Sequence, residues 1–535
     1  MSLILIFIIL PILVVSYYQY HHHSDTGHRR GGTTTPPSSP SCRPIIGNLV
    51  GTILNYNRFY DHVTDHFIST ASLTIHVPTF LHLSHFIATV DPKNLAHVLK
   101  SNFHNYVKGS RFADNLTDLL GDGIFNADSD FWSVQRKIAS HEFNTKSLRS
   151  FVSKSVNHEI EHRLVPLLSR AAKEGRVFDL QRVFQRYMLD TICDVAFGFD
   201  PRCLDPEMIV DDGLVGSEFA RAFDDASETC IFRLLNPIPA IWKAKRLLNV
   251  GSERRFREAV MVLDEYAMKI IESKETKLER SKKTDGNHSE DKDDDVDLLT
   301  RFMRSKIDLD FKSDHEKRKF YRDVVISFIL AGRDTTASAL TWFFWLISGH
   351  PHCHQKIYDE ISPIMNQYHS ALGYEDLKKF DYLHAALSES MRLFPPVPMN
   401  SRVALSNDTL PDGTLVRKGW MADYSAYAMG RMEKVWGEDC REFRPERWLD
   451  EKGEYRPFDQ FKYPVFHCGP RICLGKDMAY VQMKMVAAVV IYGFEFVAEN
   501  RGGTPERMGR PPYNVSLVMK MKGGLKVKVR RRESQ

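Results

Sequence analysis

The chain lacks several features that point to common classes of site. Its eight cysteines include no Cys-x-x-Cys pair, so neither a zinc ribbon nor a dithiol redox motif is expected. Its formal net charge is only +4 over 535 residues, whereas a nucleic-acid partner usually shows as a concentrated basic stripe. No internal repeat is evident, which argues against a solenoid or a propeller. The sequence therefore predicts no nucleic-acid partner.

What the sequence does contain is typical of a globular protein with a sizeable core, since 43% of its residues are apolar and 26% are charged. Segments with helical periodicity dominate, and short alternating runs resemble strands. Examples are residues 147–172 and 254–271 for helices, and residues 72–90 and 514–529 for strands. The charged stretch from Ser281 to Asp295 is predicted to be a solvated loop. We expect a mainly α fold with small β-sheets, in one large domain over residues 45–535.

The N-terminus begins with an uncharged apolar run from Leu3 to about Tyr18, close to the roughly 17–25 residues that span a bilayer. We expect residues 1–20 to form a transmembrane anchor and residues 21–44, which are rich in proline, to form a linker. A cleaved signal peptide is the alternative, but the sequence has no basic n-region and no small-x-small cleavage site. Arg29 and Arg30 follow the apolar run, which predicts a single-pass protein whose main domain faces the cytosol.

The cysteines and the glycosylation sequons indicate different cellular compartments for that domain. Scattered cysteines favour a reducing compartment, in agreement with the cytosolic orientation. Four Asn-x-Ser/Thr sequons would suit a lumenal protein equally well, and they lie at Asn115, Asn287, Asn407 and Asn514.

A loop that meets the start of a helix carries the strongest chemical signal. The segment Phe466–Gly475 precedes an apolar stretch with helical periodicity from Met478 to Phe494. Unpaired amides at a helix start carry partial positive charge, which lowers the pKa of a thiol and stabilises a thiolate. Cys473 lies where this effect is largest. Cys468 is the rival thiol, but it lies away from the helix start and is expected to be an inert buried residue.

The residues around this thiol indicate a flat, anionic cofactor. Gly469 and Gly475 permit unusual backbone angles and a close approach, and Arg471 supplies a cation. Together with Phe466 and Cys473 they form Phe-x-x-Gly-x-Arg-x-Cys-x-Gly, which resembles the haem-ligand signature of the cytochrome P-450 superfamily at every fixed position. The resemblance implies the cytochrome P-450 fold and a haem b whose iron is ligated by the Cys473 thiolate. A structural cysteine beside a turn is the alternative.

A second resemblance to the same superfamily concerns a group of charges. Glu389 and Arg392 lie one turn apart on a predicted helix, Asp381–Leu393, and Arg447 follows downstream. Taken alone, such a pair is usually a solvated surface bridge. The resemblance implies that Glu389, Arg392 and Arg447 form a buried triad that holds the loop carrying Cys473.

An apolar segment at residues 320–348 contains charges in its middle. Arg333 and Asp334 make a second membrane span costly, so a long core helix is predicted. A carboxylate in such a helix costs free energy unless it is paired or functional. The segment Ala331–Thr336 resembles the oxygen-site pattern of the superfamily, which implies that Asp334 relays protons and that Thr335 hydrogen-bonds the iron-bound oxygen. The alternative is that Asp334 is paired only with Arg333.

Three further residues resemble the superfamily groups that bind haem propionates. Trp132 and Arg136 share a helix face and match Trp-x-x-x-Arg, and Arg402 lies ten residues after Arg392. The fork of donors on an arginine can bind both oxygens of a carboxylate. The resemblance therefore implies that Trp132, Arg136 and Arg402 bind the cofactor.

Finer features resemble the plant clan of fatty-acid ω-hydroxylases, especially its ninety-fourth family, at residues 331–345, 461–484 and 520–524. The resemblance implies a monooxygenase that inserts one oxygen atom of O2 at or near the terminal carbon of an aliphatic substrate, most readily by fatty-acid ω-hydroxylation. Hydroxylation of a jasmonate–amino-acid conjugate or of a steroid side chain is the alternative. Some animal ω-hydroxylases link haem to a glutamate at the position of Ala331, and no such ester can form here.

The resemblance also implies partners and a location. These are NADPH-cytochrome P-450 reductase, a small lipophilic substrate, O2, and the lipid of the endoplasmic reticulum membrane around the anchor. A basic face with Lys137, Lys462 and Lys476 is expected to steer an acidic reductase, unless it is merely a solvated surface. Two competing functions are a haem-thiolate isomerase or dehydratase, which needs neither oxygen nor reductase, and a haem-based sensor or carrier. The pair formed by Asp334 and Thr335 argues against both.

Overall fold

The computed structural model describes residues 36–43, 46–79, 85–143, 146–204, 217–236, 238–284, 297–304, 311–368, 372–499 and 510–532. The anchor predicted at residues 1–20 lies outside these residues, as does most of the linker predicted at residues 21–44. Within the stretches just given, no helix combines the length and the apolar character needed to cross a bilayer.

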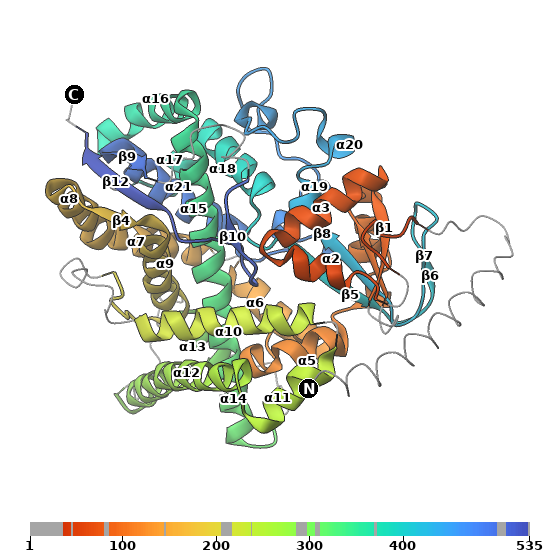
Figure 1. Cartoon of the computed structure of the whole chain (residues 1–535). Helices are drawn as coiled ribbons and strands as arrows, with labels where there is room; N and C mark the ends of the chain where they lie inside the picture. The colour runs from red at the N-terminus through yellow and green to blue at the C-terminus, as the bar shows by residue number, and fades with distance from the viewer. Residues whose placement is uncertain are drawn as a thin grey trace, which may run out of the picture.

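Helices make up most of the described chain, and the prediction of a mainly α protein with small sheets is confirmed. In chain order they are α2 (Leu49–Leu54), α3 (Phe59–Thr70), α4 (Pro92–Ala96), α5 (Gly109–Leu120), α6 (Ser129–Phe143), α7 (Lys146–Glu159), α8 (Val165–Glu174), α9 (Leu180–Phe197), α10 (Ser217–Leu235), α11 (Pro239–Leu248), α12 (Ser252–Thr284), α13 (Leu298–Arg304), α14 (Asp314–Ile329), α15 (Thr335–Gly349), α16 (Pro351–Tyr368), α17 (Tyr374–Leu377), α18 (Asp381–Leu393), α19 (Ala426–Met429), α20 (Glu433–Trp436) and α21 (Lys476–Gly493). Figure 1 shows α9 and α15 side by side in the middle of the molecule, with α10 and α12 crossing below them.

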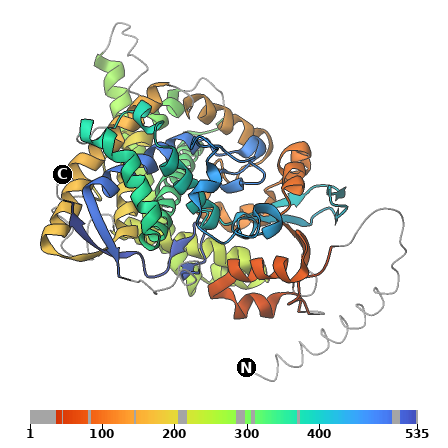
Figure 2. The same ribbon diagram turned by 90° about the horizontal axis from the view of Figure 1, so that it is seen from above.

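Small sheets flank the helical body. Their strands are β1 (Thr74–Pro78), β2 (His85–Thr89), β3 (Tyr106–Val107), β4 (Val177–Asp179), β5 (Met399–Ala404), β6 (Asp408–Thr409), β7 (Leu415–Val416), β8 (Met421–Ser425), β9 (Phe494–Ala498), β10 (Tyr513–Asn514), β11 (Lys520–Met521) and β12 (Lys526–Arg531). The largest sheet has the order β1-β2-β8-β5-β3, in which β2 and β8 are parallel and the other neighbours antiparallel. A three-stranded antiparallel sheet, β4-β12-β9, lies on the opposite side of the molecule (Figures 1 and 2).

The core helix predicted at residues 320–348 is present and is longer than expected. It begins with α14 at Asp314 and ends with α15 at Gly349, and a π-type turn, η8 (Leu330–Asp334), joins the two parts. Ser313 extends the helix beyond the apolar segment, because its hydroxyl accepts a backbone N–H of the first turn and so caps the start. Single π-turns inside α-helices are frequent at functional sites, and this one contains the predicted acid.

The segment that follows β10 completes the core. The carbonyl of Met519 accepts hydrogen bonds from the hydroxyl of Ser338 at 2.6 Å and from the indole N–H of Trp342 at 3.1 Å, both on α15. The side chain of Gln181 on α9 is paired with the backbone of Met521, donating at 3.1 Å and accepting at 2.8 Å. Strand β12 then pairs with both β4 and β9. The last part of the described chain is therefore bonded to the central helices.

Two expected helix limits were wrong by a few residues. The solvated loop predicted from Ser281 begins later, because α12 continues to Thr284, and residues 285–296 lie outside the described chain. The helix predicted from Met478 begins at Lys476. In both cases charged residues at a helix end continue the backbone hydrogen bonding without contributing to the apolar pattern.

Candidate active site

Cys473 lies in the loop between the short turn η11 (Gly469–Arg471) and α21. Its backbone N–H donates to the carbonyl of Phe466 at 2.8 Å, and the N–H of Gly475 donates to its thiol. The side chain keeps accessible surface, although it lies deep among protein atoms. The thiol therefore faces an opening within the molecule rather than the outer surface.

The polypeptide alone does not lower the pKa of this thiol. Burial is the largest influence and raises the pKa of Cys473, while the Gly475 N–H, Arg136 and Lys476 act in the opposite direction. The helix-start amide of Gly475 lowers the pKa of the thiol as expected, but desolvation outweighs it in the polypeptide alone. A coordinated metal would deprotonate the thiol, and the Gly475 N–H and Arg136 would stabilise the resulting negative sulfur.

The two motif glycines differ in whether the backbone at their position requires a glycine. Gly469 has a φ of +64°, and a Cβ there would collide with the carbonyl of Leu99, so only glycine fits. Gly475 has a φ of −86°, which any residue adopts, and the expectation of an unusual backbone angle there is wrong. The donation of its N–H to Cys473 does not depend on glycine.

The rival thiol of Cys468 packs in a different environment. It is 1% exposed and donates to the carbonyl of Gln460 at 2.9 Å. Burial raises the pKa of the Cys468 thiol to about 12. This cysteine is held as a protonated donor and is not a candidate ligand.

Arg471 links the cysteine loop to α6. Its Nη2 donates to Asp128 at 2.7 Å, and its guanidinium lies 4.4 Å from the ring centroid of Trp132. Arg136, one turn after Trp132 on α6, interacts electrostatically with Cys473 and with Arg471. The structure therefore brings Trp132, Arg136 and Arg471 together beside the thiol.

Arg402 on β5 is 1% exposed and lies in the same region. Its Nη1 donates to the carbonyl of Ser401 at 2.8 Å, and its Nη2 lies 2.6 Å from Nε2 of His467. Its Nε has no hydrogen-bond partner in the described part of the chain. Lys108 is buried nearby, and burial together with Arg402 and Arg471 lowers the pKa of Lys108 well below its usual range.

Lys108 and His467 are two members of this site that sequence reasoning missed. Burial and the neighbouring charges of Arg402 and Lys108 lower the pKa of His467 well below its usual range, so the ring is neutral. His467 stands at a variable position of the cysteine motif, and Lys108 belongs to no motif. Only the tertiary fold brings these residues together, so no local pattern indicates them.

The charges of this region fit a haem. Lys108, Arg136, Arg402 and Arg471 are the basic groups of this region, and burial lowers the pKa of each. Asp128 is the carboxylate whose charge acts on Lys108, Arg402 and Arg471. Burial lowers the pKa of Arg402 and brings that of Arg471 to about 10. Buried cations are unfavourable without counter-charges. The propionate groups of a haem supply such charges, and the free Nε of Arg402 is a donor for one of them.

Glu389 is fully buried, and the structure brings Arg392 and Arg447 to it. Nη2 of Arg392 lies 2.7 Å, and Nε of Arg447 3.4 Å, from Oε1 of Glu389. The indole N–H of Trp448 donates to Oε2 at 2.9 Å, and the backbone N–H of Arg444 donates to Oε1 at 3.1 Å. One carboxylate thus satisfies two cations and two neutral donors.

This triad reaches the cysteine loop indirectly. Arg392 donates to the carbonyls of Cys440 at 2.6 Å and Glu442 at 3.0 Å, which fixes the segment before Arg447. The ring of Trp448 lies 4.7 Å from the ring of Tyr463, which precedes the cysteine motif. The triad therefore reaches the cysteine loop through the packing of Trp448 against Tyr463.

Asp334 and Thr335 lie at the π-turn of the core helix. Asp334 is paired with Arg333 at 3.1 Å and with Lys520 of β11 at 3.0 Å, so the alternative of pairing with Arg333 alone is wrong. Lys520 also contacts Asp224 of α10 at 2.6 Å. No local pattern indicated Lys520, because the C-terminal segment reaches the acid only in the folded chain.

One face of the core helix is partly accessible. All residues from Phe320 to Ser348 are buried except Ala331, Gly332 and Thr335, which are half-buried. These three share one face of the helix. The hydroxyl of Thr335 donates to the carbonyl of Ala331 at 2.5 Å. Between residues 320 and 348, the accessible part of the helix is therefore small and almost free of polar groups.

The three predicted surface lysines are not equivalent. Lys137 and Lys476 are exposed. Lys462 is half-buried, and its Nζ lies over the rings of Trp436 at 4.6 Å and Phe458 at 4.4 Å. Lys137 and Lys476 are the better candidates for contact with a partner.

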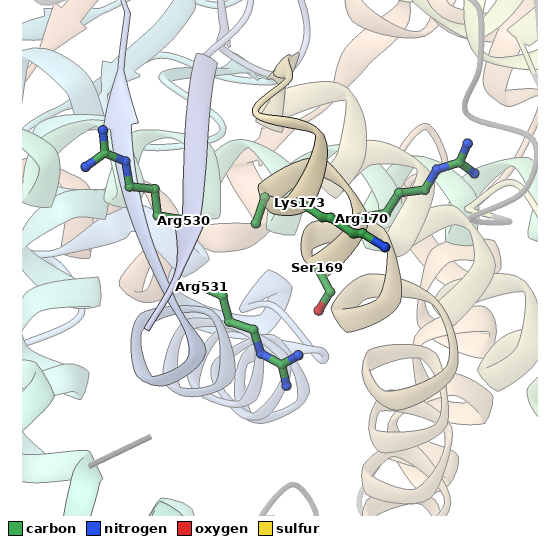
Figure 3. A pocket seen from close by; sticks show the side chains of 6 residues that line it. Ser169, Arg170, Lys173, Arg530 and Arg531 are labelled. Carbon is green, nitrogen blue, oxygen red and sulfur yellow. The ribbon is translucent and has the colours of Figure 1, made fainter. Parts of the chain in front are cut away.

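A surface cavity of about 480 Å³ between α8 and β12 contains none of the predicted site residues. Figure 3 shows that Arg530 and Arg170 extend in opposite directions, whereas Arg531 and Ser169 point to the same side. The positive groups do not converge on one point, as binding of a small anion requires. The lining residues are Ser169, Arg170, Ala172, Lys173, Arg530 and Arg531.

Comparison with known proteins gives consistent matches along the chain. The family model described as Cytochrome P450 matches residues 37–528. Cytochrome P450 94A2 of Vicia sativa is 43% identical over 499 residues, which cover 92% of this chain and 91% of the relative. Cytochrome P450 94B1 of Arabidopsis thaliana is 42% identical over 502 residues, covering 93% and 92%. Cytochrome P450 94C1 of Arabidopsis thaliana is 42% identical over 455 residues, covering 84% and 86%.

Proposed function

Since this chain belongs to the cytochrome P450 family and is thereby a haem-thiolate monooxygenase, we propose that it hydroxylates an aliphatic substrate at or near its terminal carbon. A fatty acid is the substrate class that we expect. The relatives carry the number 94 in their names, so the resemblance to the ninety-fourth family is confirmed. A jasmonate–amino-acid conjugate or a steroid side chain is the alternative substrate.

The accessible face of the core helix carries this proposal. Ala331, Gly332 and Thr335 are small and half-buried, so this face carries no charged side chain. At Gly332 it packs closely against the apolar side chain of Ile192 on α9. The charged neighbours Arg333 and Asp334 are 1% exposed and are paired away from it. An unfunctionalised hydrocarbon end suits this surface better than a charged headgroup, because burying a charge without a partner is costly.

The residues that would hold the cofactor follow from the site. Cys473 would ligate the iron, and Lys108, Arg136, Arg402 and Arg471 would bind the propionates of a haem b. When bound, the haem activates O2, and electron donation from a thiolate favours cleavage of the O–O bond. The N–H of Gly475 and the positive charge of Arg136 stabilise the sulfur anion.

Proton delivery is the task of two residues at the π-turn. Thr335 belongs to the accessible face, and its hydroxyl holds a proton that it donates to the carbonyl of Ala331. Asp334 is one residue away, and its carboxylate makes ion pairs with Arg333 and Lys520. Release of either ion pair frees a carboxylate oxygen to accept a proton and pass it to Thr335.

Replacing Thr335 with alanine is expected to uncouple the enzyme, so that electrons from NADPH are consumed with little hydroxylated product. The hydroxyl that positions a proton at the accessible face is then missing, while the helix remains. The measurement is the ratio of product formed to NADPH oxidised, together with the hydrogen peroxide released.

Thr341→Ala is the matched control for this variant. Thr341 makes the same kind of bond, from its hydroxyl to the carbonyl of Ala337 at 2.7 Å, but it is completely buried. Its loss is expected to change stability and to leave the coupling ratio as in the wild type. Equal coupling in Thr335→Ala and the wild type would remove Thr335 from proton delivery.

The proposed electron donor is NADPH-cytochrome P450 reductase, and Lys137 and Lys476 provide charge for its docking. Reversing both charges, in Lys137→Glu with Lys476→Glu, is expected to slow reduction of the haem at low salt and to have less effect at high salt. Stopped-flow reduction at two ionic strengths measures this. The control is Lys173→Glu on α8, and an unchanged rate in the double variant would remove the docking proposal.

Placement of the protein at the endoplasmic reticulum membrane is part of the same proposal. It rests on the apolar run from Leu3 to about Tyr18, on Arg29 and Arg30 after it, and on the absence of a cleavage site. Separation of membrane and soluble fractions, followed by protease treatment of sealed microsomes, tests both the attachment and the orientation.

The proposed substrate is tested with microsomes that contain the protein and a plant reductase. Fatty acids, jasmonate conjugates and sterols are incubated with NADPH and O2, and the hydroxylated carbon is located by mass spectrometry. Terminal hydroxylation of fatty acids is the expected result. Turnover without reductase or O2 would instead indicate an isomerase or a dehydratase, and the absence of any product or spectral shift would favour a sensor.

A further inference from the structure

Three tyrosine hydroxyls meet around one serine below the cysteine loop. The hydroxyl of Ser388 on α18 lies 3.0 Å from that of Tyr455 and 2.9 Å from that of Tyr480 on α21. The hydroxyl of Tyr463 donates to the backbone carbonyl of Ser388 at 3.1 Å. We call Ser388, Tyr455, Tyr463 and Tyr480 the tyrosine cluster.

Packing alone does not explain the cluster, because burying its hydroxyl groups costs free energy. Tyr463 and Tyr480 are buried, and burial raises the pKa of each well above its usual range, so both stay protonated. His384 stacks on Tyr455 with centroids 3.9 Å apart and tilts against Tyr480 at 4.2 Å. Burial lowers the pKa of His384 to about 2, so its ring is neutral. Phenylalanine would fill these positions without the desolvation cost of buried hydroxyls.

The cluster connects the cysteine loop with the surface. The ring of Tyr480 lies 5.3 Å from the ring of Phe466, and the carbonyl of Phe466 accepts the backbone N–H of Cys473. At the other end Tyr455 is half-buried and reaches solvent. The stacked rings of Tyr455 and Trp448, 6.0 Å apart, widen the aromatic path. Oxidisable rings thus run from the neighbourhood of the thiolate to water.

We propose that Tyr480 and Tyr455 form a protective electron relay. The relay supplies electrons to the haem site when that site has become strongly oxidising and no substrate is bound to react with it. The monooxygenase reaction generates that oxidising power from O2 and reductase electrons. Tyr480 gives one electron to the haem site, and Tyr455 then gives one electron to the oxidised Tyr480. The oxidising equivalent is moved to the surface, away from the cofactor.

The hydrogen bonds of the cluster carry the accompanying proton. A phenol loses its proton when it is oxidised. The hydroxyl of Ser388 is bonded to both Tyr480 and Tyr455, so it passes a proton from Tyr480 towards Tyr455 and returns one when Tyr480 is reduced. Tyr455 releases its own proton to water. The net step converts the Tyr455 phenol to a phenoxyl radical, with one electron going to the haem site and one proton going to solvent. A soluble thiol or ascorbate reduces the radical and restores Tyr455.

The relay is tested without any aliphatic substrate, so its outcome is separate from the question of substrate class. The ferric holoprotein is mixed with hydrogen peroxide, frozen within milliseconds and examined by electron paramagnetic resonance, while bleaching of the haem absorbance is followed in parallel. Wild type is expected to give a tyrosyl signal. Tyr480→Phe is expected to lose that signal and to bleach several-fold faster.

Tyr492→Phe is the matched control, because Tyr492 is also on α21 and donates to Asn366, outside the cluster. It is expected to match the wild type in both measurements. A second measurement uses unmodified protein, in which mass spectrometry maps oxidised tyrosines after peroxide treatment, with Tyr455 and Tyr480 as the expected positions. Oxidation confined to other tyrosines, or equal signal and bleaching in Tyr480→Phe, would overturn the relay.

Discussion

Replacing Cys473 with serine is expected to abolish the red-shifted Soret band of the reduced, carbon-monoxide-treated protein and to reduce hydroxylation to background. A serine hydroxyl stays protonated and donates little charge to iron, whereas the thiolate supplies the electron density on which O–O cleavage depends. The change in size is small, so the loop that bonds residue 473 to Phe466 has no steric reason to move. The band and the haem content are measured on the same sample.

Cys468→Ser is the matched control for this prediction. Its side chain is also a thiol on the loop, but it points to the carbonyl of Gln460 and is buried. The band should be retained in this variant, with a modest loss of thermal stability. An unchanged band in Cys473→Ser would reject the assignment of the ligand and with it the description of the site.

Replacing Glu389 with alanine is expected to abolish haem incorporation. Arg392 and Arg447 would be left with unpaired charge, and Arg392 is 1% exposed. Removing one member of a buried ion pair costs roughly 3–5 kcal/mol, a large part of the about 5–15 kcal/mol by which proteins are stable. The indole N–H of Trp448 would lose its acceptor as well. The ratio of haem to protein and the yield of soluble protein measure the effect.

Arg444→Ala separates this effect from general damage to the region. Arg444 pairs with Asp439 through a side chain that is 58% exposed, and exposed pairs contribute only about 0–1 kcal/mol. Its backbone N–H, which donates to Glu389, is kept in the variant. Holoprotein should form normally in this control. A full yield of holoprotein in Glu389→Ala would refute the structural role of the triad.

Local patterns predicted the elements that depend on neighbouring residues. The helix Asp381–Leu393 has the expected limits, because an apolar face repeats along it and Pro395 and Pro396 follow it. The loop and helix start at Cys473 were predicted for the same reason, since the motif and the helix are contiguous. The long core helix was predicted from its apolar residues. Its length was underestimated because charged residues, which do not contribute to the apolar pattern, continue the helix at its start.

Contacts between distant segments could not be predicted in this way. Lys108 meets Arg402, and Lys520 meets Asp334, through folding of segments that are far apart in the chain. The net direction of the pKa shift of Cys473 could not be derived from the sequence for a related reason. The sequence indicates the helix amide that lowers the pKa but not the amount of protein around the thiol, which raises it. Burial is a property of the whole fold.

The bonds made by Met519 have a consequence for biosynthesis. Its carbonyl accepts from Ser338 and Trp342, and β12 closes the sheet with β4, whose residues precede it by most of the chain. A ribosome must therefore finish nearly the entire polypeptide before α15 acquires these partners. Until then the core of the nascent protein is incomplete, so chaperone binding during translation should be prolonged. Truncations that remove only the last strands should yield protein that is degraded.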